Sequence, residues 1–273
     1  MNVTFTDTHC HIQSIELGNE DDRTYKLWNR ASWSIHDVIE RANTAGVTKL
    51  VCVGCDLGDS ELALRVANNY SNCFASIGIH PHEAGRHKSL KTAREALQDM
   101  AVQKKVVSIG ECGLDYFYNI SLPEEQKDLL KMQLEVAVEY DLPVIFHVRE
   151  AFYDFWPIFD YYGKGKIRGV LHSFTDSKQI LSLALERGLF IGINGISTFA
   201  RDERMQSMYR SVPLDRILLE TDSPYLTPNP YRGMINEPKQ IITIAKHLVD
   251  LSVGDINALS AATEHNARTL FAI

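Results

Sequence analysis

Long apolar runs are missing from this 273-residue sequence. No stretch approaches the roughly 20 apolar residues that a membrane-spanning helix needs. The N-terminus also lacks the basic region and apolar core that mark a secretory signal. We therefore expect a cytoplasmic protein without a membrane partner.

Cysteine is scarce, with five residues in the whole chain. An odd number in a chain of this length does not indicate a disulfide framework. Cys52 and Cys55 form one C-x-x-C pattern, but no second pattern completes a four-cysteine zinc site. We expect these cysteines to be ordinary buried or loop residues.

Positively charged residues are fewer than negatively charged ones: the sequence has 28 Lys and Arg residues and 35 Asp and Glu residues, so the net charge is -7. A broad, charge-driven coating of nucleic acid needs a basic surface, so this class of binding is disfavoured. A nucleic-acid enzyme remains open, since a metal centre and a few local arginines can supply the positive field.

Short apolar runs that alternate with amphipathic segments dominate the rest of the chain. They predict strands at residues 3–5, 47–54, 73–79, 106–110, 143–146, 167–171, 189–193 and 216–219. They predict helices at residues 35–45, 60–70, 89–103, 123–141, 150–162, 177–187, 202–210, 238–251 and 254–271. Strands without polar alternation are typical of parallel sheets that are buried on both faces.

Eight strand–helix units in roughly 250 residues favour a (β/α)8 TIM barrel with an additional C-terminal helix. No G-x-G-x-x-G follows the first strand, which disfavours an open dinucleotide-binding sheet. No linker interrupts the pattern, so we predict a single domain over residues 1–273.

One polar segment, residues 15–33, interrupts the alternation of predicted strands and helices and contains Trp28 and Trp33. It follows the first strand, where a barrel places its first active-site loop. Two interpretations stay open: a lid or substrate platform, or a surface excursion that is held down by its aromatic side chains.

Histidines and acids gather where the predicted strands end. In a barrel, functional groups lie at the carboxyl ends of the strands. These positions are occupied by His9, His11, His80, His82, Glu111, His147, His172 and Asp222. Mixed imidazole and carboxylate ligands predict a site for a divalent metal such as Zn, Mn, Fe, Ni or Co.

Two ions explain this pattern better than one. His9 and His11 share a strand face, and Asp222 follows the eighth strand, which neighbours the first in a closed barrel. His147 and His172 follow two adjacent strands, and Glu111 lies between the two sets with two oxygens to share. Two ions ~3.5–4 Å apart would activate a shared water.

Six longer motifs carry a strong resemblance to the TatD family of metal-dependent deoxyribonucleases. They are Thr6-Asp7-Thr8-His9-Cys10-His11, Gly78-Ile79-His80-Pro81-His82, Ile109-Gly110-Glu111-Cys112-Gly113-Leu114-Asp115-Tyr116, Phe146-His147-Val148-Arg149, His172-Ser173-Phe174-Thr175 and Leu219-Glu220-Thr221-Asp222-Ser223-Pro224-Tyr225-Leu226. Cys112, Ser173 and Asp176 depart from the usual family motifs, but none of them changes a ligand.

The resemblance implies a (β/α)8 barrel with two divalent metal ions, whose identity stays open among Zn, Mn, Mg, Ni and Co. His9, His11, Glu111 and Asp222 would hold one ion, and Glu111, His147 and His172 the other. The implied activity is hydrolysis of DNA phosphodiesters, as a 3′–5′ exonuclease on single strands or 3′ ends. Asp222 would be both a ligand and the proton acceptor, and the protein would be a monomer or weak oligomer.

Four further residues are candidates around the ions. Glu220 lies on the strand face of Asp222, where it would either support a ligand or act on a further metal or the attacking water. Arg149 follows His147 by two residues, and its guanidinium could bind a phosphate bidentately. His80 and Arg232 are further candidates for substrate contacts.

Two alternative functions stay open. The same metal pair could polarise a carbonyl, which would make the protein an amidohydrolase-type enzyme for a small ester, lactone or amide. The chain could also be a non-catalytic scaffold that binds nucleic acid.

Overall fold

The computed structural model describes residues 3–20, 22–163 and 165–273. The chain divides into two compact units. Unit 1 comprises Met1–Cys52 and Ser173–Ile273, and unit 2 comprises Val53–His172. The single-domain organisation stays a prediction.

Unit 1 contains four parallel strands: β1 (Phe5–Cys10), β2 (Val47–Val53, whose last residue falls in unit 2), β7 (Phe190–Ile193) and β8 (Ile217–Leu219). β1 pairs with β2 and β7 pairs with β8, while a parallel bridge from Cys10 to Ser223 joins β1 to the segment after β8. The helices are α1 (Arg23–Ala31), α2 (Ile35–Thr44), α7 (Lys178–Glu186), α8 (Glu203–Arg210), α9 (Ile241–Asp250) and α10 (Ile256–Phe271). Short 3-10 helices lie at Ile12–Glu16, Gly195–Phe199, Leu214–Arg216 and Pro238–Gln240.

Unit 2 has a second run of four parallel strands: β3 (Cys73–Ile77), β4 (Val106–Asp115), β5 (Val144–Arg149) and β6 (Gly169–Leu171). Within this unit each strand pairs with the next one along the chain. The helices are α3 (Leu57–Asn69), α4 (Leu90–Ala101), α5 (Pro123–Glu139) and α6 (Phe152–Gly163), and a 3-10 helix spans Pro81–Arg86.

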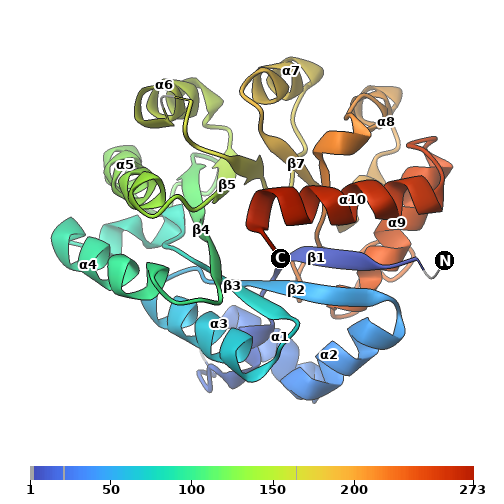
Figure 1. Ribbon diagram of the computed structural model, residues 1–273, viewed down its shortest axis with the longest axis horizontal. Coiled ribbons are helices and arrows are strands. Elements are labelled where there is room, and N and C mark those ends of the chain that lie inside the picture. Colours follow the sequence, from blue (N-terminus) through green and yellow to red (C-terminus); the bar gives the residue numbers. More distant parts are fainter. Residues whose placement is uncertain (1–2, 21, 164) are drawn as a thin grey trace. The chain divides into compact units, whose positions relative to one another are not determined.

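The last helix covers the first strand. α10 contacts both β1 and β8, and Figure 1 shows it beside β1 although the two lie at opposite ends of the chain. The Ser260 hydroxyl donates to the Thr4 carbonyl at 2.6 Å, and the Thr6 hydroxyl donates to Glu264 at 2.7 Å. These bonds hold the strand that carries His9.

Three strands run further than the sequence predicts, and burial explains two of them, β1 and β4. All residues of β1 and β4 are buried, so their polar members are paired inside the sheet and do not end it. β1 therefore includes His9 and β4 includes Glu111. β5 extends through His147 to Arg149 because it stays paired with the long strand β4, up to the pair of Asp115 with Arg149. The ends predicted at residues 5, 110 and 146 are wrong, because an apolar run alone marks only part of a strand.

Residues 15–33 are not a simple loop, because they include α1. Asp22 begins this helix by accepting a hydrogen bond from the Tyr25 N–H at 2.8 Å. Trp28 is 1% exposed and donates from its indole nitrogen to the His11 carbonyl at 3.0 Å. The segment is thus anchored by an aromatic side chain, as one interpretation proposed; Asp21 lies outside the described residues.

Within the described ranges, each helix is either too short or too polar to span a bilayer.

Candidate metal centre

Three predicted ligands meet in unit 1 and form the His9 cluster, which we define as His9, His11 and Asp222. The two histidine Nε2 atoms are 3.3 Å apart, and Asp222 Oδ1 lies 3.2 Å from His11 Nε2 and 3.6 Å from His9 Nε2. Two imidazoles and a carboxylate oxygen that converge in this way fit a divalent cation.

The backbone places the carboxylate of Asp222. Its N–H donates to the His9 carbonyl at 2.8 Å, and the His11 N–H donates to the Ser223 carbonyl at 2.9 Å. Asp222 adopts a φ of 58°, a left-handed conformation that costs a non-glycine residue about 1–2 kcal/mol. The two hydrogen bonds therefore hold a strained residue against the histidines.

Asp7 supports the same cluster and was not predicted from the sequence. Its Oδ1 accepts from the backbone N–H groups of Thr221 and His9, at 2.9 and 3.2 Å, and its Oδ2 accepts from the Thr221 hydroxyl at 2.5 Å. Burial raises the pKa of this carboxyl to about 8, although the hydrogen bonds act in the opposite direction. The sequence did contain a signal for this role, because Asp7 lies two residues before His9 and an acid at that spacing shares its strand face.

Glu220 is buried and lies two residues before Asp222 in the sequence. Residues outside the His9 cluster hydrogen-bond to its carboxylate. Its Oε1 accepts from the Ser173 N–H at 2.7 Å and from the Asn194 side-chain amide at 3.3 Å. A Cβ on Gly192 would lie 2.4 Å from Glu220 Oε2, so only glycine leaves room for this carboxylate. These contacts favour the interpretation that Glu220 supports the site.

The second group lies in unit 2 and forms the Glu111 cluster, which we define as His80, Glu111, His147 and His172. A single oxygen, Glu111 Oε1, lies 2.9 Å from His147 Nδ1, 3.8 Å from His172 Nε2 and 3.9 Å from His80 Nε2. The ligand atoms of His80, Glu111 and His147 lie within 4.8 Å of one another.

Asp115 orients His147 from the opposite side. Its Oδ2 lies 2.9 Å from His147 Nε2 and 3.0 Å from His82 Nε2, and its Oδ1 accepts from the N–H groups of Phe117 and Tyr118. A ligating histidine typically donates its second N–H to a carboxylate, which is what Asp115 provides. Sequence reasoning missed this role, although Asp115 shares a strand face with Glu111, four residues earlier.

Charge in unit 2 follows from these contacts. Burial opposes a charged His147, but the hydrogen bonds to Asp115 and Glu111 outweigh it and raise the pKa of His147 to about 9. Burial also acts against a charged Asp115, yet His147 and His82 hold the pKa of Asp115 well below its usual range. The pKa of His80 lies well below its usual range because of burial and the neighbouring His147.

The backbone sets the proton position on His80. Its Nδ1 accepts from the His82 N–H at 3.2 Å, so the neutral ring carries its proton on Nε2, which faces Glu111. His80 is therefore a hydrogen-bond donor towards the cluster.

The predicted arginines contact aromatic rings. The Arg149 guanidinium lies 4.0 Å from the Phe117 ring centre and 5.1 Å from that of Tyr118. The Arg232 guanidinium lies 5.4 Å from the ring centre of Phe199. Such stacking orients a guanidinium and leaves its N–H groups available.

Comparison with known proteins identifies the family of the chain. Residues 6–272 match the family described as TatD related DNase. The chain belongs to this family. TatD-family membership confirms the resemblance and makes the protein a metal-dependent hydrolase of the nuclease class.

Two curated relatives cover most of the chain. The 3'-5' ssDNA/RNA exonuclease TatD of Shigella flexneri serotype 5b (strain 8401) is 35% identical over 243 residues, which is 87% of this chain and 92% of that protein. An uncharacterized metal-dependent hydrolase of Bacillus subtilis (strain 168) is 30% identical over 270 residues, which is 98% of both proteins. With the donor clusters, this similarity supports the use of a divalent metal.

A solved TatD homologue decides the fold class. The crystal structure of the homologue from Escherichia coli K12 matches with a TM-score of 0.85 and 30% identity, and the match covers all of both chains. The predicted (β/α)8 TIM barrel is confirmed, and α10 is the additional C-terminal helix.

Proposed function

We propose that the protein is a metal-dependent 3′–5′ exonuclease that removes nucleotides from single-stranded nucleic acid, with DNA as its principal substrate. The convergence of His9, His11 and Asp222 within 3.6 Å carries the proposal, because it brings together the donor set of a metallohydrolase. The similarity to the exonuclease of Shigella flexneri supports the substrate and the polarity.

The proposed ligand sets follow the two clusters. His9, His11, Glu111 and Asp222 would hold one divalent ion, and Glu111, His147 and His172 would hold the other. The metal is Zn, Mn, Mg, Ni or Co. Bound divalent ions supply Lewis acidity, which lowers the pKa of a water and neutralises charge on phosphate oxygens.

Residues of the chain handle protons and orientation. Asp222 accepts the proton of the attacking water, and its backbone bonds to the His9 region hold the carboxylate in place. His80, with its proton on Nε2, donates to a phosphate oxygen of the substrate. Arg149, which stacks on Phe117, binds a phosphate through its guanidinium edge. Arg232 contacts the nucleic-acid substrate at a second position.

Digestion of single-stranded DNA and RNA oligonucleotides tests the proposal. A 5′-labelled strand should give a ladder that shortens from the 3′ end when Mn²⁺, Mg²⁺, Zn²⁺, Co²⁺ or Ni²⁺ is present. Asp222→Asn should abolish the ladder, whereas the exposed control Asp215→Asn should retain it. An intact oligonucleotide under every metal, together with turnover of a lactone, ester or amide panel, would reject nuclease activity.

A further inference from the structure

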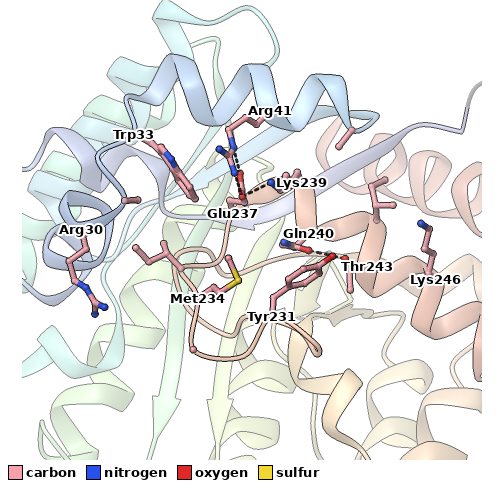
Figure 2. Close-up of a pocket in the computed structure, with 15 residues that line it drawn as sticks. Arg30, Trp33, Arg41, Tyr231, Met234, Glu237, Lys239, Gln240, Thr243 and Lys246 are labelled. Atoms are coloured by element: carbon pink, nitrogen blue, oxygen red, sulfur yellow. Dashed lines mark hydrogen bonds and ion pairs between the residues drawn. The ribbon is translucent and has the colours of Figure 1, made fainter.

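A cavity of about 610 Å³ lies in unit 1, apart from the ligands of the His9 cluster. Figure 2 shows side chains from the first two helices on one side of it and side chains from residues 231–246 on the other. We call it the basic pocket; its cationic and aromatic lining residues are Arg30, Trp33, Arg41, Tyr231, Lys239 and Lys246.

Positive charge dominates the basic pocket. Four of its lining residues are cationic and one, Glu237, is acidic, in a chain whose net charge is -7. Glu237 is 3% exposed and binds Arg41 at 2.7 and 2.6 Å and Lys239 at 2.9 Å, as the dashed lines in Figure 2 mark. One carboxylate therefore holds two cations in place and leaves an excess of positive charge.

Arg30 and Lys246 add to this excess. Both side chains are exposed, and neither has an ion-pair partner within residues 3–20, 22–163 and 165–273. Unpaired cations at the wall of a cavity attract an anionic ligand, and phosphate groups suit both guanidinium and ammonium donors.

Flat and apolar groups complete the lining. Trp33 is half-buried and its ring centre lies 4.1 Å from the Arg41 guanidinium, so one cation is already stacked and oriented. Tyr231 is 40% exposed and Met234 is 65% exposed. Exposed aromatic faces beside cations are typical of surfaces that bind single-stranded nucleic acid by base stacking.

Both walls of the basic pocket are attached to segments that carry the His9 cluster. Trp33 lies 6.5 Å, ring to ring, from Trp28, whose indole nitrogen donates to the His11 carbonyl. On the other wall Asn236, which precedes Glu237, donates to the Thr221 carbonyl at 2.9 Å, one residue before Asp222. A molecule bound in the pocket would therefore lie next to the segments that carry His9, His11 and Asp222. It would not contact these three residues, because none of them lines the pocket.

We propose that the basic pocket binds a nucleotide of the substrate strand at a position away from the bond that is cut. Separate phosphates of the strand contact Arg30 and Lys246, which Figure 2 shows at opposite ends of the pocket, and the base stacks against Trp33 and Tyr231. Neither a simple anion nor an apolar ligand would use both the cations and the aromatic faces. The inference rests on the proposed nuclease function, because it names a second binding position for the same strand.

Binding to the metal-loaded enzyme tests the phosphate contacts. The probe is a fluorescent, phosphorothioate-linked single-stranded dT12, which resists cleavage and keeps the backbone charge. Arg30→Glu with Lys246→Glu should raise the Kd at least tenfold. The control, Lys104→Glu with Lys166→Glu, makes the same change in net charge at two exposed lysines outside the pocket and should stay within twofold. Equal effects of the two pairs would overturn the inference.

A second measurement tests the stacking. Trp33→Leu, which keeps an apolar side chain but removes the aromatic face, should weaken binding of dT12 by about tenfold, as expected for loss of one good stacking partner. It should leave binding of an abasic strand of equal charge within twofold. Equal losses for both strands would reject base stacking at this position.

Turnover separates this inference from the proposed function. The charge-reversed pocket should lower kcat/KM for dT12 at least tenfold and leave cleavage of the dinucleotide dTpdT within twofold. If the wild-type protein cleaves neither substrate but pocket variants still weaken binding, the proposed function fails and the pocket assignment stands. If it cleaves both and the pocket variants match wild type, only the pocket assignment fails.

Discussion

Asp7 and Thr221 join the first strand to the segment after the eighth through two hydrogen bonds, from the backbone N–H and the hydroxyl of Thr221. The two residues are 214 positions apart in sequence. Because His9 follows Asp7 by two residues and Asp222 follows Thr221 by one, this contact sets the spacing of the first ligand cluster.

Removing the Asp7 carboxyl should destabilise the fold and weaken metal binding together. Asp7→Ala leaves the buried N–H groups of Thr221 and His9 without their acceptor, which costs about 3 kcal/mol of unfolding free energy. Urea unfolding and metal titration measure both effects. The exposed control Asp215→Ala should stay within about 0.5 kcal/mol of wild type, and an equally stable Asp7→Ala protein would refute the role assigned to Asp7.

Asp115 should act through His147. Asp115→Asn removes the carboxylate that accepts from His147 Nε2, so the pKa of His147 in the metal-depleted protein should fall from about 9. Activity or metal affinity should drop about 10–100-fold. NMR titration of His147 and oligonucleotide digestion check these results, and Asp128→Asn, at an exposed residue of α5, should change neither.

Glu111 should be indispensable if it is shared between two ions. Glu111→Ala should abolish turnover and lower the metal content from about two ions per chain. Elemental analysis and the digestion ladder give the two readings, with the exposed Glu61→Ala as a control. Wild-type activity of Glu111→Ala at full metal occupancy would disprove the sharing.

His247 should make unfolding sensitive to acid. Burial holds the pKa of His247 below its usual value, although its bond to the Ser197 carbonyl acts in the opposite direction. The unfolded chain therefore gains a proton near pH 6.5 that the folded chain does not take up, and stability is lost as the pH falls through this range.

The comparison of His247→Gln with wild type checks this sign. Any stability difference between the two proteins at pH 8 should shift in favour of His247→Gln as the pH drops from 7 to 5. A difference that is constant over this range would show that His247 does not cause the acid sensitivity.

Much of the fold could be predicted because the strands are apolar and each is followed by an amphipathic helix. Serine is a preferred N-cap residue, and Ser34 directly precedes the helix predicted at residues 35–45; the structure has its full capping box with Asp37. The helix α1 was missed, since it is short and mostly polar and buries a single residue, Trp28. Its position depends on the tertiary bond from Trp28 to His11.

The candidate site, like the fold, could be predicted only in part from the sequence. Sequence alone determined which residue types end the strands, and the spacing of His9 and His11 placed both on one strand face. Only the tertiary structure brought Asp222 to them and paired Asp115 with His147. It also joined Arg30 and Trp33 to Tyr231 and Lys246, far along the chain, in one pocket. The reason is physical: periodicity reports which face a side chain occupies, whereas its partner depends on how distant segments pack.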